Sequence, residues 1–474
     1  MKLIVEVPNT YLPEREYIIK VLIDCYLGIP YVIKKSNTKQ VLISLSPDYN
    51  KKTVVIEEVF FKATEKNWLK SASMPKQPIK WWEINESLIN LPCGEKRVPV
   101  LFGADPYTFK YFQVYEDGIF LGLDVFGSAF FMLTRYEEMV RSDRDEHDRF
   151  PASASLAHQE GFLERPIIDE YVEILWACMK YLWPRLERKE NKFQVCLSHD
   201  VDTPYYLAFM PFHKAVKTCS GDILKRKNPR LAADKMSRWI KVKRGELESD
   251  PYNAFNYIMK TSEENNIKST FYFMSSSDSS YDSKYMLEHP YMKSLLNQIN
   301  TREHKIGLHP SYNTYLEPEK INAEFMALLD VCNSLGIDQD TWGGRQHYLR
   351  WQAPDTWQSY ADAGLDYDAT LSYADHAGFR CGTCREFPVF NLLTRQTLNL
   401  IEKPLIAMEC SLLDERYMGL DYEGAWNTLK CFIDYCKLYK GTFSLLWHNS
   451  QLVHAKDIDF YNEIIKYSSF CLKR

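Results

Sequence analysis

The chain has 474 residues, of which 45% are hydrophobic and 26% are charged, so it can form a large core and two or more domains. The formal net charge of -5 does not suggest a general binder of nucleic acid or anionic membranes. No stretch reaches the roughly 20 apolar residues that span a bilayer, and no signal peptide is recognisable, so we expect a cytoplasmic protein without a membrane span.

Residues 1–190 are expected to form a smaller α/β module. Short alternating runs such as "KLIVEV" and "TVVIEEVFF" predict strands, whereas "EREYIIKVLIDCYLG" and "IIDEYVEILWACMKYLW" predict helices. These runs indicate architecture, and they carry no residue with an evident chemical role.

Residues 191–474 alternate between short apolar runs and helical stretches. The strand candidates are "FQVCLSHD", "KSTFYFMS", "HKIGLHPS", "TWGGRQHY", "LDYDATLSY", "PLIAMECSLL" and "TFSLLWHNS". Alternation at this spacing predicts a parallel α/β sheet or barrel. In such folds the chemistry sits at the carboxyl ends of the strands, and several candidates end in polar residues.

Residues 213–244 interrupt this alternation with a segment rich in lysine and arginine. The simpler interpretation is a solvated helical insertion. The alternative is a basic lid that holds an anionic group of the substrate, such as a phosphate.

The first strand candidate ends in "SHDVD". Asp200 and Asp202 are two residues apart, so a regular strand directs both side chains to the same face. One carboxylate can then bind a metal while the other accepts a proton from water. His199 points to the opposite face, so we expect it to support the site indirectly.

Two later strand candidates also end in polar residues. His309 ends the third, and Asn313 follows at the spacing that places two side chains on one helical face. An aspartate and a histidine on neighbouring strand ends would suit a divalent metal. Arg345, near the end of the fourth, would orient a carboxylate and lower its pKa.

The remaining candidates lie farther along the chain. Tyr348, Asp368 and Trp447 are candidates for substrate binding. His448 ends the last strand candidate, where it could protonate a leaving group. Each signal is weak alone, but their succession on separate strand ends is not readily explained by chance.

The motifs "SHDVD", "HPSYN", "RQHY", "YDATLSY" and "LWH" resemble those of the polysaccharide deacetylases of carbohydrate esterase family 4, the chitooligosaccharide deacetylase homology domain. The resemblance extends over roughly the region from 191 to the end of the chain. It implies a distorted (β/α) barrel of about seven strands. It also implies the metal-dependent removal of acetyl groups from N-acetylated or O-acetylated sugars.

The resemblance implies a role for each matched residue. It makes Asp200 the catalytic base, steadied by Arg345, and His448 the general acid, with Asp202 and His309 as metal ligands. Asn313 stands where the family has a second ligand histidine. An amide oxygen is a weaker ligand than imidazole, so the metal stays open, with zinc expected first and cobalt, manganese or nickel as alternatives.

Three functions remain open from the sequence. The first is removal of acetyl groups from an N-acetylated sugar or glycan, which could bear a phosphate. The second is hydrolysis of C–N amide bonds in compounds other than sugars. The third, motivated by Asn313, is a catalytically silent carbohydrate-binding protein. Residues 1–190 resemble a module of unassigned function that precedes such domains in bacterial proteins.

Overall fold

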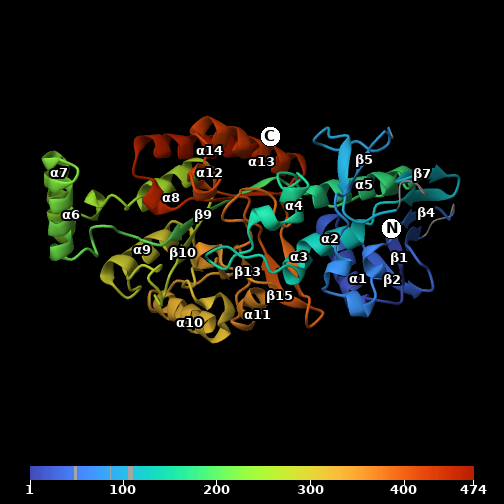
Figure 1. Ribbon diagram of the computed structural model, residues 1–474, viewed down its shortest axis with the longest axis horizontal. Coiled ribbons are helices and arrows are strands. Elements are labelled where there is room, and N and C mark those ends of the chain that lie inside the picture. Colours follow the sequence, from blue (N-terminus) through green and yellow to red (C-terminus); the bar gives the residue numbers. More distant parts are fainter. Residues whose placement is uncertain (47–50, 86, 105–109, 474) are drawn as a thin grey trace. The chain divides into compact units, whose positions relative to one another are not determined.

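The computed structural model describes residues 1–46, 51–85, 87–104 and 110–473 (Figure 1). The chain divides into two compact units. Unit 1 consists of Met1–Gln194 and Tyr348–Phe443, and unit 2 consists of Val195–His347 and Ser444–Arg474. The first change of unit lies close to the predicted boundary at residue 190. Residues 348–443, which we predicted as part of the second domain, instead group with the N-terminal residues.

Unit 1 contains a sheet with the strand order β2-β1-β3-β4-β8-β7. In β1 the alternate residues Leu3, Val5 and Val7 are buried, which is the pattern of a strand that covers a core with one face. The strands are β1 (Lys2–Pro8), β2 (Tyr31–Ser36), β3 (Val41–Ser46), β4 (Thr53–Ile56), β7 (Phe112–Tyr115) and β8 (Gly118–Leu121); β5 (Lys80–Glu83) pairs separately with β6 (Arg97–Val100).

The other elements of unit 1 come from both of its chain segments. Its helices are α1 (Leu12–Ile19), α2 (Val125–Leu133), α3 (Tyr136–Val140), α4 (Leu156–Gln159), α5 (Ile167–Leu182), α11 (Asp355–Asp362), α12 (Glu409–Leu413) and α13 (Tyr422–Leu438). Its short strands are β13 (Tyr367–Asp368), β14 (Phe387–Asn391), β15 (Gln396–Glu402) and β16 (Ala407–Met408). β15 pairs in parallel with β13 and antiparallel with β14.

Unit 2 is built on parallel strands. β9 (Gln194–Val201), β10 (Ser269–Phe273), β11 (Lys305–Leu308) and β12 (Gly343–Gly344) pair in parallel in that order, and β17 (Thr442–Leu446) lies on the other side of β9. The helices are α6 (Phe212–Leu224), α7 (Pro229–Lys243), α8 (Phe255–Glu264), α9 (Pro290–Thr301), α10 (Pro318–Ser334) and α14 (Ala455–Leu472). Since β9 to β12 run in the same direction, their carboxyl ends meet at one edge.

The mixed α/β class is confirmed, and so is parallel pairing for β9 to β12. The seven predicted strands of the C-terminal region correspond, in order, to β9, β10, β11, β12, β13, β16 and β17. β14 and β15 were missed because they form a hairpin with no helix between them, outside the alternation that the prediction used. The barrel stays a prediction.

None of the helices in the described ranges has both the length and the apolar character that crossing a bilayer requires.

His199 anchors β9 from the face opposite to Asp200. Its ring stacks on Phe271, its neighbour on β10, with a centroid separation of 5.0 Å. Its Nδ1 lies 2.7 Å from the carbonyl oxygen of Trp447, which can only accept, so Nδ1 carries the proton. The imidazole therefore joins β9 to the segment after β17.

We expect His199 to make the protein less stable in acid. Burial is the dominant influence, and it lowers the pKa of His199 to about 3. A histidine in the unfolded chain titrates near pH ~6.5. The stabilisation is therefore complete above pH ~6.5 and is lost as the pH falls toward the folded-state value.

The measurement is denaturant unfolding of the wild type and of His199→Asn, whose amide can still donate to the Trp447 carbonyl. Between pH ~6.5 and ~3 the wild type should lose more stability than the variant, by at most about 5 kcal/mol. Parallel losses in the two proteins would contradict this role for His199.

Candidate metal centre and active site

The strand ends of unit 2 bring polar side chains to one edge of the parallel sheet. Asp202 follows β9, His309 follows β11 and Arg345 follows β12. The backbone N–H of His309 donates to the carbonyl of Phe273 at 2.8 Å, and that of Arg345 donates to the carbonyl of Leu308 at 3.0 Å. The sheet register thus continues to the residues that were predicted to form the site.

Gly307 leaves room for the ring of Tyr272, which packs against the guanidinium of Arg345. Tyr272 lies between Asp200 on β9 and Gly307 on β11. A Cβ atom at Gly307 would come within 2.5 Å of the Tyr272 ring, so a larger residue would displace the ring. The guanidinium carbon of Arg345 lies 4.7 Å from the centre of this ring, a distance typical of a cation–π contact.

Arg345 fixes the orientation of Asp200. Its Nη1 donates to Asp200 Oδ1 at 2.9 Å and to Ser198 Oγ at 2.8 Å, and all three side chains are buried. Burial lowers the pKa of Arg345, but the attraction of Asp200 opposes this effect, and the pKa of Arg345 is raised overall. The other carboxylate oxygen of Asp200, Oδ2, lies 3.9 Å from His309 Nε2.

Asp202, His309 and His347 form a group that could hold a metal ion. One ligand atom from each lies within 4.8 Å of the others. The Nε2 atoms of His309 and His347 lie 3.1 Å and 3.7 Å from Asp202 Oδ1. One carboxylate oxygen and two imidazole nitrogens are a donor set that suits zinc and similar divalent ions, so these residues fit the predicted cofactor.

The hydrogen bonds of the two histidines direct the correct nitrogen toward Asp202. His309 Nδ1 lies 2.6 Å from the carbonyl oxygen of Arg345, so Nδ1 carries the proton. His347 Nδ1 lies 2.9 Å from Asp282 Oδ1, another acceptor. In both rings Nε2 is then the atom available to a metal, and a hydrogen bond at Nδ1 is the usual support for such a ligand.

The charges of the site influence one another. Burial disfavours ionisation of Asp202, but His347, a hydrogen bond from His309 and the nearby His448 hold its pKa well below the usual range. Burial also opposes protonation of His309, yet Asp200 and Asp202 raise its pKa. The site therefore attracts positive charge, either a proton or a metal ion.

His448 and Asp202 are the members of the site that reach the surface. His448 Nε2 lies 3.6 Å from Asp202 Oδ2, and their side chains are 14% and 32% exposed. Asp200, His309 and His347 are nearly inaccessible. A substrate would therefore meet His448 and Asp202 first.

Asp282 holds His347 in place from a loop between β10 and α9. It is buried and accepts hydrogen bonds from Ser279 Oγ at 2.7 Å and from the Tyr312 N–H at 2.9 Å. Burial raises the pKa of a carboxyl group, but these bonds and the one from His347 hold the pKa of Asp282 well below its usual range. The carboxylate is thus ionised and its orientation is fixed.

Asn313 is not placed as the sequence analysis assumed. The spacing from His309 to Asn313 is that of one helical face, whereas the chain forms a turn at residues 312–313 and a short 3-10 helix at Thr314–Leu316. Helical spacing therefore does not apply to His309 and Asn313, and Asn313 is exposed. His347 supplies the second imidazole of the group instead.

The predicted substrate-binding residues lie in different surroundings. Trp447 is buried and packs against Phe460 and Tyr461 of α14, as a core residue does. Tyr348 and Asp368 belong to unit 1. The Tyr348 ring lies 4.8 Å from that of His147, and buried Asp368 accepts a hydrogen bond from the Thr370 N–H at 2.9 Å. Their part in substrate binding stays a prediction.

Sequence reasoning missed His347 and Asp282. His347 stands inside the quoted motif "RQHY", two residues after Arg345 and beyond a strand end, so position alone could have suggested it. Asp282 lies in the polar stretch "SSSDSSYDS", where no periodicity or motif separates it from its neighbours.

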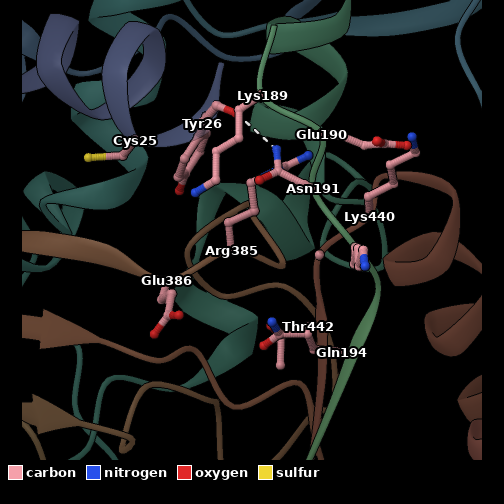
Figure 2. A pocket seen from close by; sticks show the side chains of 12 residues that line it. Cys25, Tyr26, Lys189, Glu190, Asn191, Gln194, Arg385, Glu386, Lys440 and Thr442 are labelled. Carbon is pink, nitrogen blue, oxygen red and sulfur yellow. Dashed lines mark hydrogen bonds between the residues drawn. The ribbon is translucent and has the colours of Figure 1, made fainter. Parts of the chain in front are cut away.

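A separate cavity of about 310 Å³ lies in unit 1 (Figure 2). Lys189, Arg385 and Lys440 line it together with Glu190 and Glu386, so both signs of charge are present. None of the predicted site residues is among the residues that line it. The cavity and the candidate metal centre are therefore formed by different residues.

Comparison with known proteins gives three findings. Residues 3–184 match the model of a family of unknown function (DUF7033), and this segment lies within the predicted N-terminal module. The chain is also similar to a crystal structure provisionally named a polysaccharide deacetylase from Mycobacterium smegmatis, with a TM-score of 0.37, 14% identity, and coverage of 59% of this chain and 85% of that one. None of the curated proteins matches. So low a structural similarity does not define an activity.

Replacing His347 should remove a metal ligand, whereas replacing Asn313 should not. We expect His347→Ala to weaken zinc binding by more than about 100-fold, because loss of a ligand should exceed the typical effect of losing its supporting group. Asn313→Ala is the matched control. The dissociation constant for zinc measured by calorimetry on the full chain tests this, and equal affinities for the two variants would contradict the ligand set.

Replacing Asp282 should act on the metal through His347. Asp282→Asn keeps an acceptor but removes the charge that fixes the ring, so we expect zinc affinity to fall about 10–100-fold. The thermal midpoint of the metal-free protein separates this effect from general destabilisation. A lower midpoint with unchanged zinc affinity would restrict Asp282 to a structural role.

Proposed function

We propose that the protein is a metal-dependent hydrolase that removes acetyl groups from an N-acetylated sugar or glycan and releases acetate. The observation that carries the proposal is the pairing of two features in unit 2. Asp202, His309 and His347 offer three ligand atoms within 4.8 Å of one another, and Asp200, held by Arg345, lies beside them. In metal-dependent hydrolysis of an amide, a cation polarises the carbonyl group and a base accepts the proton of the attacking water.

The proposed cofactor is a divalent cation, with zinc first. Asp202, His309 and His347 would hold it. When bound, such an ion supplies a Lewis acid that polarises a carbonyl group and lowers the pKa of water.

Asp200 is the proposed general base. Its Oδ1 is engaged by Arg345, which leaves Oδ2 as the oxygen that can accept a proton. The guanidinium keeps the carboxylate from rotating and balances its charge in a buried position. The attacking water would therefore give up its proton to one defined oxygen atom.

His448 is the proposed general acid. It follows β17 and lies near Asp202, and it is partly exposed, so it can meet a leaving group that arrives from solvent. An imidazolium there would protonate the departing nitrogen, and the amine would leave as a neutral group.

The choice of substrate rests on the resemblance of the motifs to those of polysaccharide deacetylases. The catalytically silent alternative was motivated by Asn313. His347 supplies a second imidazole, so this reason for preferring a silent protein no longer applies. Hydrolysis of amide bonds in compounds that are not sugars would use the same chemistry. Only a survey of substrates separates this function from the proposed one.

We expect Asp200→Asn to lower kcat for acetate release by about 10²–10⁴-fold, because the proton acceptor is lost. Zinc binding should persist, since Asp200 is not among the three ligands. Acetate release is measured on N-acetylated sugars and on simple acetamides, with the zinc-loaded full chain.

Asp330→Asn on α10 is the matched control, because it makes the same change on an exposed position of unit 2. It should behave as the wild type. Full activity in Asp200→Asn would remove Asp200 as the base. Release of acetate from simple acetamides but from no sugar would replace the proposed substrate class and retain the mechanism.

A further inference from the structure

The basic insertion of unit 2 forms a hairpin of two helices. α6 and α7 lie side by side, with Cys219 Sγ donating to the carbonyl of Ala232 at 3.5 Å. The side chains of Trp239 and Lys243 donate to the carbonyls of Met210 and Ala208, which holds the hairpin at its base. Figure 1 shows α6 and α7 standing apart from the other helices of unit 2.

The end of this hairpin exposes aliphatic side chains. We call residues 223–231, which comprise the end of α6, the connecting residues and the start of α7, the hairpin tip. Leu224 is 77% exposed, Ile223 49% and Leu231 37%. Single exposed apolar residues are common on protein surfaces, but these three gather where α6 ends and α7 begins, and a cluster of this kind is typical of an interaction surface.

The hairpin tip is also strongly basic. It contains Lys225, Arg226, Lys227 and Arg230, and its nearest acid, Asp222, is buried and already bonded to Arg226 at 2.7 Å. Within the described ranges, no carboxylate pairs with Lys225, Lys227 or Arg230. Residues 213–244 contain eleven lysines and arginines and two aspartates, a local charge of +9 in a chain whose net charge is -5.

We propose that the hairpin tip docks the protein on the surface of an anionic phospholipid bilayer. Aliphatic side chains beside lysines match such a surface, since the former enter the acyl boundary while the latter meet lipid phosphates. The phosphates of a nucleic acid could pair with the lysines and arginines, but the aliphatic side chains would then contact charged phosphates. The tip also has no aromatic residue that could stack on bases.

The projecting position favours a surface over a bound molecule. A lid that holds a phosphate of the substrate would have to lie over the metal-ligating group, whereas the hairpin stands apart from β9 and β10 (Figure 1). Docking by the tip would hold the candidate metal centre near a membrane and near any glycan carried there. This inference goes beyond the proposed hydrolase activity and does not depend on it.

The test is sedimentation of the full chain with phosphatidylcholine vesicles that contain or lack phosphatidylglycerol. The wild type should bind only the anionic vesicles, and added salt should weaken binding. The double variant Ile223→Ser, Leu224→Ser should lose about tenfold or more in partition coefficient. Lys225→Gln and Lys227→Gln should each lose about fivefold.

Met286→Ser is the control, because Met286 is 67% exposed in unit 2 outside the hairpin, and it should bind as the wild type. All substituted positions are exposed, and circular dichroism checks that the variants fold. Equal binding to both kinds of vesicle, no binding, or full binding by the double variant would overturn the proposal. Tip-dependent binding to duplex DNA that is tighter than to vesicles would assign the tip to nucleic acid. Acetate release plays no part in this readout.

Discussion

A buried guanidinium organises the candidate site. Arg345 cannot lose its proton, so its burial requires a carboxylate, and Asp200 provides it. The backbone N–H of the same residue continues β12 by donating to the carbonyl of Leu308, and its own carbonyl accepts a hydrogen bond from His309 Nδ1. One residue thereby sets the orientation of the proposed base and of one proposed metal ligand. Packing of Tyr272 beneath it, made possible by Gly307, keeps the guanidinium in place.

Sequence reasoning succeeded where regular strand geometry determines position. Alternation along β9 predicted that Asp200 and Asp202 face one way and His199 the other, and the contacts of His199 with Phe271 agree with this. Strand ends also predicted that Asp202, His309 and Arg345 meet at one edge. These inferences needed only the period of a strand and the parallel arrangement of the sheet.

The same reasoning failed where the chain leaves regular structure. The resemblance placed Asn313 at a ligand position and helical spacing supported this, but the residues after His309 form a turn and a short 3-10 helix and no α-helix. His347 is placed by a turn whose next two residues, Tyr348 and Leu349, have positive φ angles of 60° and 53°. Asp282 reaches His347 across 65 positions of sequence. Contacts of this kind depend on how loops fold over the sheet edge, which no local pattern encodes.

The balance of charge explains why this group of residues would accept a cation. Asp200, Asp202 and Asp282 contribute three carboxylates, whereas Arg345 is the one permanent cation that pairs with them in the part of the chain that the structure describes. Neutral imidazoles would leave the group with an excess of two negative charges at partly buried positions, which is costly. Protonation of His309 reduces this excess, in agreement with its raised pKa, and a divalent ion would cancel it. Protons and metal ions should therefore compete for the same Nε2 atoms, and metal binding should release protons from the histidines.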